Sequence, residues 1–170
     1  AARQLSVQHD YQGSIRGPIA SGGEAQGNGL GGAQLAHAVI EGGIESLQAL
    51  QRGLPPAQFE AAVDLMLGAP ALWLAASGRA FPVGAYLAYA LQHTAKPVHW
   101  LHGLGAMQKG ELRALPPGDV MLAVSFEPYA PETLEVVDLA LARGARLLAL
   151  TDSQLSPLAA RATVTLLAQD

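Results

Sequence analysis

Residues 123–137, AVSFEPYAPETLEVV, combine side chains that bind anions with a stiff loop between two regular elements. An apolar run ends at Ser125, two prolines bracket Tyr129, and a helical pattern begins at Glu132 and Thr133. The prolines restrict the backbone, and tyrosine offers both a ring face and a hydroxyl. The first N–H groups of a helix have no intrahelical partner and can bind an anion. In an open α/β sheet, ligands bind where a strand passes to a helix, so this loop is the first candidate for a ligand site.

The composition excludes several kinds of partner. The 170 residues carry a net charge of −4, and the ten lysines and arginines are scattered, which argues against nucleic-acid binding by these residues alone. Cysteine is absent, so disulfides and thiolate metal sites are excluded and a reducing compartment is favoured. No apolar run reaches the roughly 18–20 residues of a membrane span, and the N-terminus carries no signal-peptide pattern. We therefore expect a soluble cytoplasmic protein without membrane contact.

The first third of the chain predicts a linker followed by two helices. Residues 11–32 contain eight glycines and almost no periodic apolar residues, which is typical of a linker or mobile arm. Apolar residues then follow helical spacing from Ala33 to about Arg52, and a second, shorter helix is expected over residues 57–67. Gly53 and the two prolines that follow it end the first helix. The two helices are expected to form a hairpin ahead of the main domain.

After Gly68, short apolar runs alternate with helical stretches. The runs are apolar at consecutive positions, as in the strands of a parallel sheet that is covered on both faces. We therefore expect a doubly wound α/β domain. The expected strands are residues 71–76, 97–101, 119–124, 146–150 and 163–167. The expected helices are residues 81–94, 107–114, 131–143 and 155–161.

Several motifs in this region resemble the sugar isomerase (SIS) domain, in the form found in RpiR/MurR-type bacterial transcription regulators. They are ASGRAF after the first strand, VSFEPYAPET around the third, GARLLALTDS around the fourth and SPLAARATVTLL into the fifth. The resemblance implies a five-stranded parallel sheet of flavodoxin-like order 2-1-3-4-5. It also implies that residues 33–170 are a SIS effector-binding domain. Residues 1–32 would then be a linker or the remnant of an N-terminal helix-turn-helix domain that binds DNA.

The resemblance also implies where the ligand site lies. In that strand order, the loops ASGRA (76–80) and SFEPYAPE (125–132) face each other across a crevice. The chain departs from the family's phosphate-binding pattern in both loops. Ala80 stands where the first loop of the family has a serine that contacts the phosphate. The second loop lacks the family's second serine and its glycine, and has a longer stretch with two prolines in their place.

Eight residues remain as candidates for ligand contact. Arg79 could bind a phosphate or a carboxylate through two parallel hydrogen bonds. Simpler alternatives stay open: Arg79 could be a surface charge, Ser125 could bond to the backbone at a strand end, and Thr133 could be only a residue near a helix N-cap. Ser77 and Gly78 could form only a tight turn. The candidate ligand-binding residues are Ser77, Gly78, Arg79, Ser125, Tyr129, Glu132, Thr133 and Thr151.

Neither a metal nor a cofactor is expected. His99 and His102 stand three residues apart at the end of the second strand, so an extended backbone points them to opposite faces of the sheet. Their spacing alone does not make a metal pair, although His102 lies near the ligand edge and could touch a ligand. Trp73 is most simply a core residue. Ser156, just ahead of Pro157, is expected to cap a short helix.

Two functions compete on these residues. The first is a ligand-sensing domain in which a small anionic metabolite, a sugar phosphate or a sugar acid, controls DNA binding by an attached helix-turn-helix domain. The second is a sugar-phosphate isomerase, for which Glu132 and His102 are the acid–base candidates. A SIS-like module that binds nothing and serves only in dimerisation is a third alternative. The lost phosphate serines favour the sensor, and the high apolar fraction predicts a homodimer or tetramer through the helices that flank the sheet.

Overall fold

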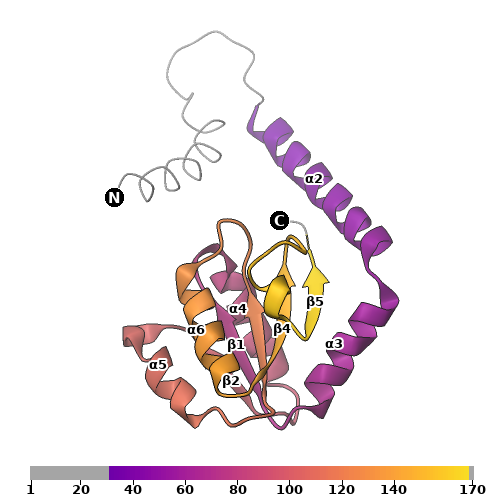
Figure 1. Ribbon diagram of the computed structural model, residues 1–170. Coiled ribbons are helices and arrows are strands. Elements are labelled where there is room, and N and C mark those ends of the chain that lie inside the picture. Colours follow the sequence, from indigo (N-terminus) through magenta and orange to yellow (C-terminus); the bar gives the residue numbers. More distant parts are fainter. Residues whose placement is uncertain (1–30, 169–170) are drawn as a thin grey trace. The chain divides into compact units, whose positions relative to one another are not determined.

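The computed structural model describes residues 31–168 (Figure 1). The chain divides into two compact units, Ala1–Gln48 and Ala49–Asp170, and each is described by itself. Most of the predicted linker, together with the suggested remnant of a DNA-binding domain, lies outside the described residues. Within the described part, no helix combines the length and the apolar character needed to cross a membrane.

Two helices precede the sheet, as predicted. Helix α2 runs over Gly32–Gly53 and helix α3 over Pro56–Gly68. Pro56 occupies the first turn of α3, where its missing N–H leaves no hydrogen bond unmade. Helix α2 contains no buried residue, whereas α3 buries Ala62 and Leu65 in the core beside the sheet.

Five parallel strands form one sheet in the order β2-β1-β3-β4-β5 (Figure 1). Leu74 at the centre of β1 lies opposite Trp100 of β2 on one side and Leu122 of β3 on the other. The order 2-1-3-4-5 is confirmed, and so are the predicted strands, each to within one residue at either end. The strands are β1 Leu72–Ala76, β2 Val98–Leu101, β3 Val120–Val124, β4 Arg146–Thr151 and β5 Val164–Leu167.

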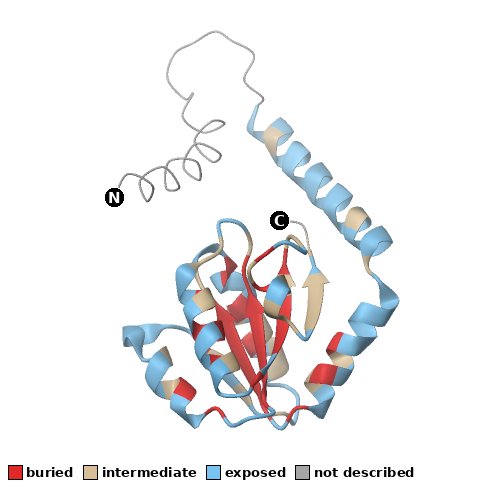
Figure 2. Cartoon of the chain, viewed as in Figure 1, coloured by how far each residue is buried: buried red, intermediate tan, exposed pale blue. Residues whose placement is uncertain are grey.

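Both faces of the sheet are covered, because successive side chains of each strand point to opposite sides. Trp73 and Met121 belong to the cluster that packs with helix α6 (Pro131–Ala142). Leu72 and Leu74 belong to the cluster on the other face, with α3 and helix α4 (Phe81–Leu91). Figure 2 shows the central strands buried along their length. The prediction that Trp73 is a core residue is confirmed.

The segment between β2 and β3 differs from the single helix predicted over residues 107–114. It holds helix α5 (Gln108–Glu111) followed by a 3₁₀ turn at Leu112–Ala114. Leu112 and Leu115 are both buried. Residues three apart lie on the same side of a 3₁₀ turn, so the tighter turn lets both leucines reach the core.

The helix predicted over residues 155–161 is wrong except at its end, where Ala159–Arg161 form a 3₁₀ turn. Ser156 is fully buried, and its Oγ accepts a hydrogen bond from the N–H of Ala159 at 3.0 Å. The bond is of the kind that a capping serine makes, but the N-cap residue of the 3₁₀ turn is Leu158 and no side chain caps that turn, so the helix that Ser156 was predicted to cap does not form. The segment is too short for a regular helix because β5 begins at Val164.

A buried carboxylate joins the amino ends of two central strands. Asp119, directly before β3, accepts a hydrogen bond from the indole N–H of Trp73 at 2.8 Å and another from the N–H of Ala71 at 3.2 Å. Both donors lie in or next to β1, and Asp119 is almost completely buried. These bonds align β1 with β3 at the end of the sheet opposite the candidate ligand site.

We predict that Asp119→Ala lowers the free energy of unfolding by about 2–4 kcal/mol, because two buried donors lose their acceptor. Equilibrium unfolding in urea measures the loss. Asp64→Ala, at an exposed position of α3, is the control and should change stability by no more than about 0.5 kcal/mol. Equal effects of the two substitutions would contradict the role given to Asp119.

Candidate functional site

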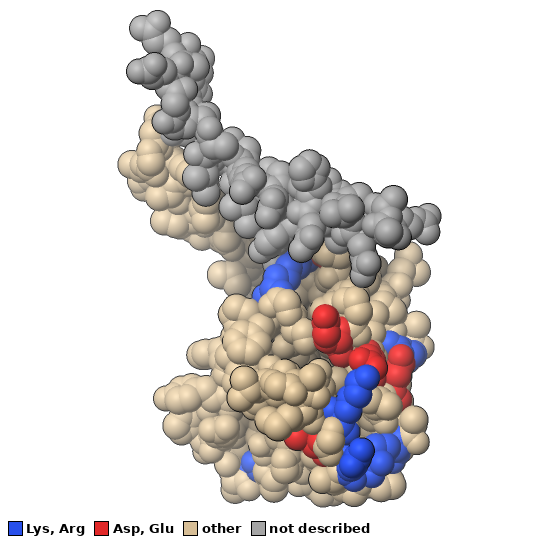
Figure 3. Space-filling view, turned by 90° about the vertical axis from the view of Figure 1, so that its left-hand side faces the viewer, with Lys and Arg blue, Asp and Glu red and all other residues tan. Residues whose placement is uncertain are grey.

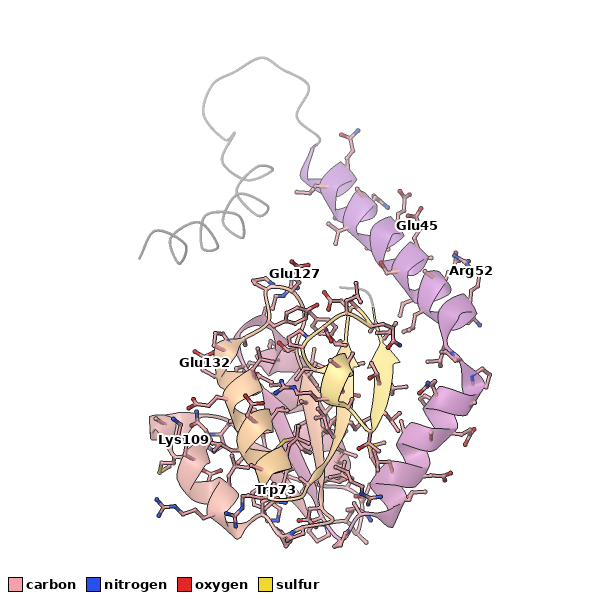
Figure 4. All side chains as sticks on the ribbon, in the orientation of Figure 1. Glu45, Arg52, Trp73, Lys109, Glu127 and Glu132 are labelled. Atoms are coloured by element: carbon pink, nitrogen blue, oxygen red, sulfur yellow. The ribbon has the colours of Figure 1, made fainter. Side chains whose placement is uncertain are left out.

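The carboxyl ends of the parallel strands lie at one edge of the sheet, and the loops after β1, β3 and β4 follow from that edge. Figure 4 shows Glu127 and Glu132 at this end and Trp73 toward the other. The chain passes from β1 through α4 to β2 on one side, and from β3 through α6 to β4 on the other. The connections therefore diverge between β1 and β3, which is where open α/β sheets bind ligands.

The loop after β1 is a tight turn into α4. Ser77 is extended, with φ −124°, and Gly78 has φ +60° in the left-handed region that favours glycine. These two residues therefore form the tight turn that was one of the two alternatives for them, and ligand contact by either residue stays a prediction. Arg79 follows on the exposed side, and its guanidinium donates a hydrogen bond to the backbone carbonyl of Glu127. The loops after β1 and β3 therefore lie against each other, as predicted.

The loop after β3 is closed by Ser125. The side chain of Ser125 is buried, and its Oγ accepts a hydrogen bond from the N–H of Ala130 at 3.1 Å. Ala130 is the N-cap residue of α6, and no side chain caps that helix. The first turn of α6 therefore has no side-chain cap, and Glu132 places a carboxylate there, at the positive end of the helix dipole.

Asp152, just after β4, fixes the loop after β3 through both of its carboxylate oxygens. Oδ2 accepts a hydrogen bond from the N–H of Glu127 at 3.1 Å, and Oδ1 accepts one from the hydroxyl of Tyr129 at 3.0 Å. The hydroxyl of Thr151 also donates to Oδ1, at 3.1 Å. The peptide groups of Glu127 therefore connect three loops: the N–H bonds to Asp152, and the carbonyl receives Arg79.

These contacts change the acidity of two groups. Burial acts to raise the pKa of Asp152, but the hydrogen bonds from Glu127, Tyr129 and Thr151 outweigh it and hold that pKa below its ordinary value of 3.8. Burial, reinforced by the hydrogen bond to Asp152 and by nearby negative charge, raises the pKa of Tyr129 above 10.0. At neutral pH the pair is therefore a carboxylate and a neutral phenol donor.

Two threonines predicted to contact a ligand are buried. Thr151 is fully buried and its hydroxyl is held by Asp152. Thr133 is 1% exposed, and its Oγ1 has no hydrogen-bond partner among the described residues. A buried hydroxyl without a partner is uncommon. It lies in the first turn of α6, within the segment expected to bind an anion.

The structure thus brings most of the predicted site residues to one edge. Arg79 and Tyr129 are connected through the loop that carries Glu127, and Ser125 closes that loop. Ligand contact itself stays a prediction for all eight residues. Asp152 was not among the predicted site residues. The signal for it in the sequence is the polar run TDS at the end of a strand that was correctly predicted.

His99 in β2 and His102 just after it lie in separate environments. His99 stacks on Trp73, with ring centroids 4.2 Å apart and planes inclined by 19°. His102 meets the edge of Trp100 at 5.6 Å, and its Nδ1 accepts a hydrogen bond from the N–H of Leu104 at 3.1 Å. Throughout residues 31–168, no group of three or more histidine or acidic side chains is arranged to hold a metal ion.

The chain is similar in sequence to proteins with a SIS domain. The family model of the SIS domain matches residues 66–170. A curated relative, the bifunctional protein glk of Paraburkholderia xenovorans, is 34% identical over 128 residues, which is 75% of this chain and 20% of that protein. The chain therefore spans about a fifth of the length of this relative.

Three solved structures are similar in fold. The sugar isomerase domain of the RpiR transcription factor from Sphaerobacter thermophilus has a TM-score of 0.75 and 30% identity, over 79% of this chain and 75% of that chain. The Vibrio vulnificus NanR protein complexed with ManNAc-6P has a TM-score of 0.72 and 21% identity, over 95% of this chain and 57% of its own. The phosphoheptose isomerase GmhA from Neisseria gonorrhoeae has a TM-score of 0.70 and 19% identity, over 81% of this chain and 87% of its own. The last two show the fold alone.

The contacts of Asp152 generate a prediction that depends on pH. In Asp152→Asn the amide nitrogen cannot accept a hydrogen bond, so at pH 7 the free energy of unfolding should fall by about 1–3 kcal/mol. The pKa of Asp152 is lower in the folded state than in the unfolded state, where it is about 3.9. The stabilisation that Asp152 provides is therefore present above the pKa of the unfolded state and is lost as the pH falls through the pKa of the folded state.

The difference in stability between the wild type and Asp152→Asn should consequently narrow below about pH 4. Urea unfolding of both proteins at a series of pH values measures it, with Asp64→Asn on α3 as the exposed control. A difference in stability between the two proteins that stays constant down to pH 3 would contradict this prediction. It would mean that the ionised carboxylate of Asp152 does not hold the loop after β3.

Proposed function

We propose that this chain, which belongs to the SIS domain family and is of the RpiR type, senses a small anionic sugar derivative. The ligand would be a sugar phosphate or a sugar acid, bound at the carboxyl edge of the sheet. The observation that carries the proposal is the contact between Arg79 and the loop that leads into the uncapped α6. It joins a guanidinium to the loop that leads into a helix N-terminus, and both groups favour negative charge.

The anionic group of the ligand would bind between Arg79 and the start of α6. Arginine can bind a carboxylate or a phosphate through two parallel hydrogen bonds. Ser125 could add a hydroxyl, since accepting a bond from Ala130 leaves its own proton to donate. Tyr129, held as a neutral phenol beside Asp152, would face the uncharged part of the ligand.

A protein of similar fold supports a phosphorylated sugar as the ligand. The departures of this chain from the family's phosphate-binding pattern support a wider choice of anionic groups. NanR, which shares this fold, was solved with ManNAc-6P. In the present chain Ala80 is buried and carries no hydroxyl, so one donor of a standard phosphosugar site is missing. We therefore propose that an anionic group suited to an arginine fork, such as the carboxylate of a sugar acid, is accepted as well.

DNA binding is assigned to an attached domain and not to this one. Figure 3 shows a face on which acidic and basic side chains lie beside one another, with large uncharged areas next to them. Lys109 pairs with Glu135, and Arg161 pairs with Asp138. Paired charges attract DNA phosphates weakly. We propose that ligand binding changes the arrangement of a homodimer and thereby the spacing of its attached helix-turn-helix domains.

The alternative is a sugar-phosphate isomerase, because GmhA shares the fold. An isomerase needs a positioned base that moves a proton between adjacent carbons. Glu132 is exposed in the first turn of α6. His102 stands at the end of β2 with its Nδ1 already accepting a hydrogen bond from the backbone. Neither residue takes part in the contacts that connect the three loops, which favours the sensor.

We predict that Arg79→Ala weakens binding of an anionic sugar roughly tenfold to a hundredfold, because a charge-assisted contact typically contributes about 1.5–3 kcal/mol. A thermal-shift screen of sugar phosphates and sugar acids would first select the ligand, since one present at about 100 times its Kd stabilises the fold by about 2.7 kcal/mol. Calorimetric titration then compares the proteins. The control is Arg113→Ala, which changes an exposed arginine near the start of β3. If Arg79→Ala binds the ligand with unchanged affinity, the anion binds at another part of the carboxyl edge.

A second prediction separates the sensor from the isomerase. The purified chain should show no turnover of pentose, hexose or heptose phosphates in a coupled assay. The reason is that neither of the acid–base candidates, Glu132 and His102, takes part in the contacts that connect the loops of the candidate site. Turnover that is abolished by Glu132→Gln would overturn the sensor proposal in favour of catalysis.

A further inference from the structure

A small cavity lies beside Asp152, at the carboxyl edge of the sheet. Its volume is about 160 Å³. A single buried water needs only about 10–15 Å³ of such space, so the cavity can hold a group of several non-hydrogen atoms. All of its lining residues belong to the unit Ala49–Asp170. They are Ala49, Leu50, Gly53, Asp152, Leu167 and Ala168.

The walls of this cavity are apolar apart from one carboxylate. Among the described residues that line it, only Asp152 has a polar side chain. Leu50 and Leu167 are each 37% exposed, so both keep apolar surface that a ligand could remove from water. Burial of apolar surface favours binding. The cavity therefore suits a group that combines a small apolar part with a polar part that meets Asp152.

Asp152 can accept one more hydrogen bond. Its Oδ1 accepts bonds from the hydroxyls of Tyr129 and Thr151. Its Oδ2 accepts one bond, from the N–H of Glu127. An ionised carboxylate offers about four acceptor positions and no donor, so the remaining position on Oδ2 requires a donor. A second anionic group at this place would be repelled.

The cavity is within reach of a ligand whose anionic group is bound by Arg79. Glu127 bonds to Arg79 through its carbonyl and to Asp152 through its N–H. One residue spans about 3.6 Å and each hydrogen bond about 3 Å, so the guanidinium nitrogen and the carboxylate oxygen are at most about 10 Å apart. A hexose that carries an anionic group at one end can span this separation.

An acylamino group meets both demands of the cavity. Its N–H can donate to the remaining acceptor position of Asp152, and its methyl group can pack on Leu50 and Leu167, while its carbonyl oxygen stays in contact with water. A hydroxyl would use the acceptor but leave the apolar walls wet. An ammonium would also use the acceptor, but a charged group is costly to place among apolar walls.

We propose that this cavity binds the acylamino group of an N-acylated amino sugar, whose anionic group is bound by Arg79 and the start of α6. The inference rests on the proposed function and deepens it, because it assigns a substituent of the ligand and the residues that recognise it. Asp152 then determines specificity in addition to supporting the loop after β3.

Calorimetric titration with three kinds of hexose 6-phosphate tests the inference. They differ only at the second carbon, which carries a hydroxyl, an amino or an acetylamino group, and each is taken in the gluco and the manno configuration. We expect the acetylamino sugar of one configuration to bind at least about tenfold more tightly than its two counterparts. The reason is that it alone both buries a methyl group and donates an uncharged N–H to Asp152.

A matched pair of variants near the end of α2 separates the cavity from the rest of the site. Ala49→Leu fills part of the cavity and should weaken binding of the preferred acetylamino sugar about tenfold, while the affinity for its hydroxyl counterpart stays within about twofold. The control is Gln51→Leu, at an exposed position that does not line the cavity. It should change neither affinity.

Nuclear Overhauser measurements on the chain with labelled leucine methyls locate the acetyl group. Its methyl should show contacts to Leu50 or Leu167. Equal affinities of the acetylamino and hydroxyl sugars, tightest binding of the amino sugar, or no binding by any of the six sugars would overturn the inference. So would contacts only to other leucines, or unchanged affinity in Ala49→Leu. If the hydroxyl sugars bind and Arg79→Ala weakens them, the proposed function stands even where this inference fails.

Discussion

The backbone of Glu127 holds the candidate site together. Its N–H bonds to the carboxylate of Asp152 after β4, and its carbonyl receives the guanidinium of Arg79 after β1. Because strands β1, β3 and β4 are adjacent and parallel, their carboxyl ends are close enough for one loop to connect all three. Asp152 adds the hydroxyls of Tyr129 and Thr151 to the same carboxylate, and this is what keeps the pKa of the carboxyl low despite burial. A ligand that binds Arg79 acts on a contact that also positions the loop after β3.

The strands could be predicted from the sequence because each is short and mostly apolar at consecutive positions, with the central strands β1 and β3 wholly apolar, as in a parallel sheet that is buried on both faces. Their order, and the meeting of the loops after β1 and β3, followed from the resemblance to SIS domains. The helix predicted over residues 155–161 is wrong because part of that segment forms the turn that buries Ser156 and the rest leads into β5. The apolar pattern of the sequence did not reveal this division of the segment. Asp152 was passed over for a related reason: a polar residue after a strand is common, and only the fold shows that two parts of a distant loop bond to it.

Membership of the SIS family and the fold fit several activities, since regulators and isomerases share them. The function must therefore be inferred from the residues at the carboxyl edge of the sheet. A buried alanine stands where the family offers a phosphate-binding serine, and an arginine that contacts the facing loop stands beside it. In our proposal, this combination favours recognition of an anion through charge and helix dipole over a ring of hydroxyl donors.

We propose that an anionic sugar binds between Arg79 and the start of α6. An amide NMR titration of the chain with the best ligand from a screen of sugar phosphates and sugar acids tests this proposal. We expect saturable shifts confined to Ser77–Ala80, to the loop from Ser125 to Ala130 and to the first turn of α6. Saturable shifts that cluster elsewhere, for example around His102 and β2, with these three segments unchanged, would contradict it.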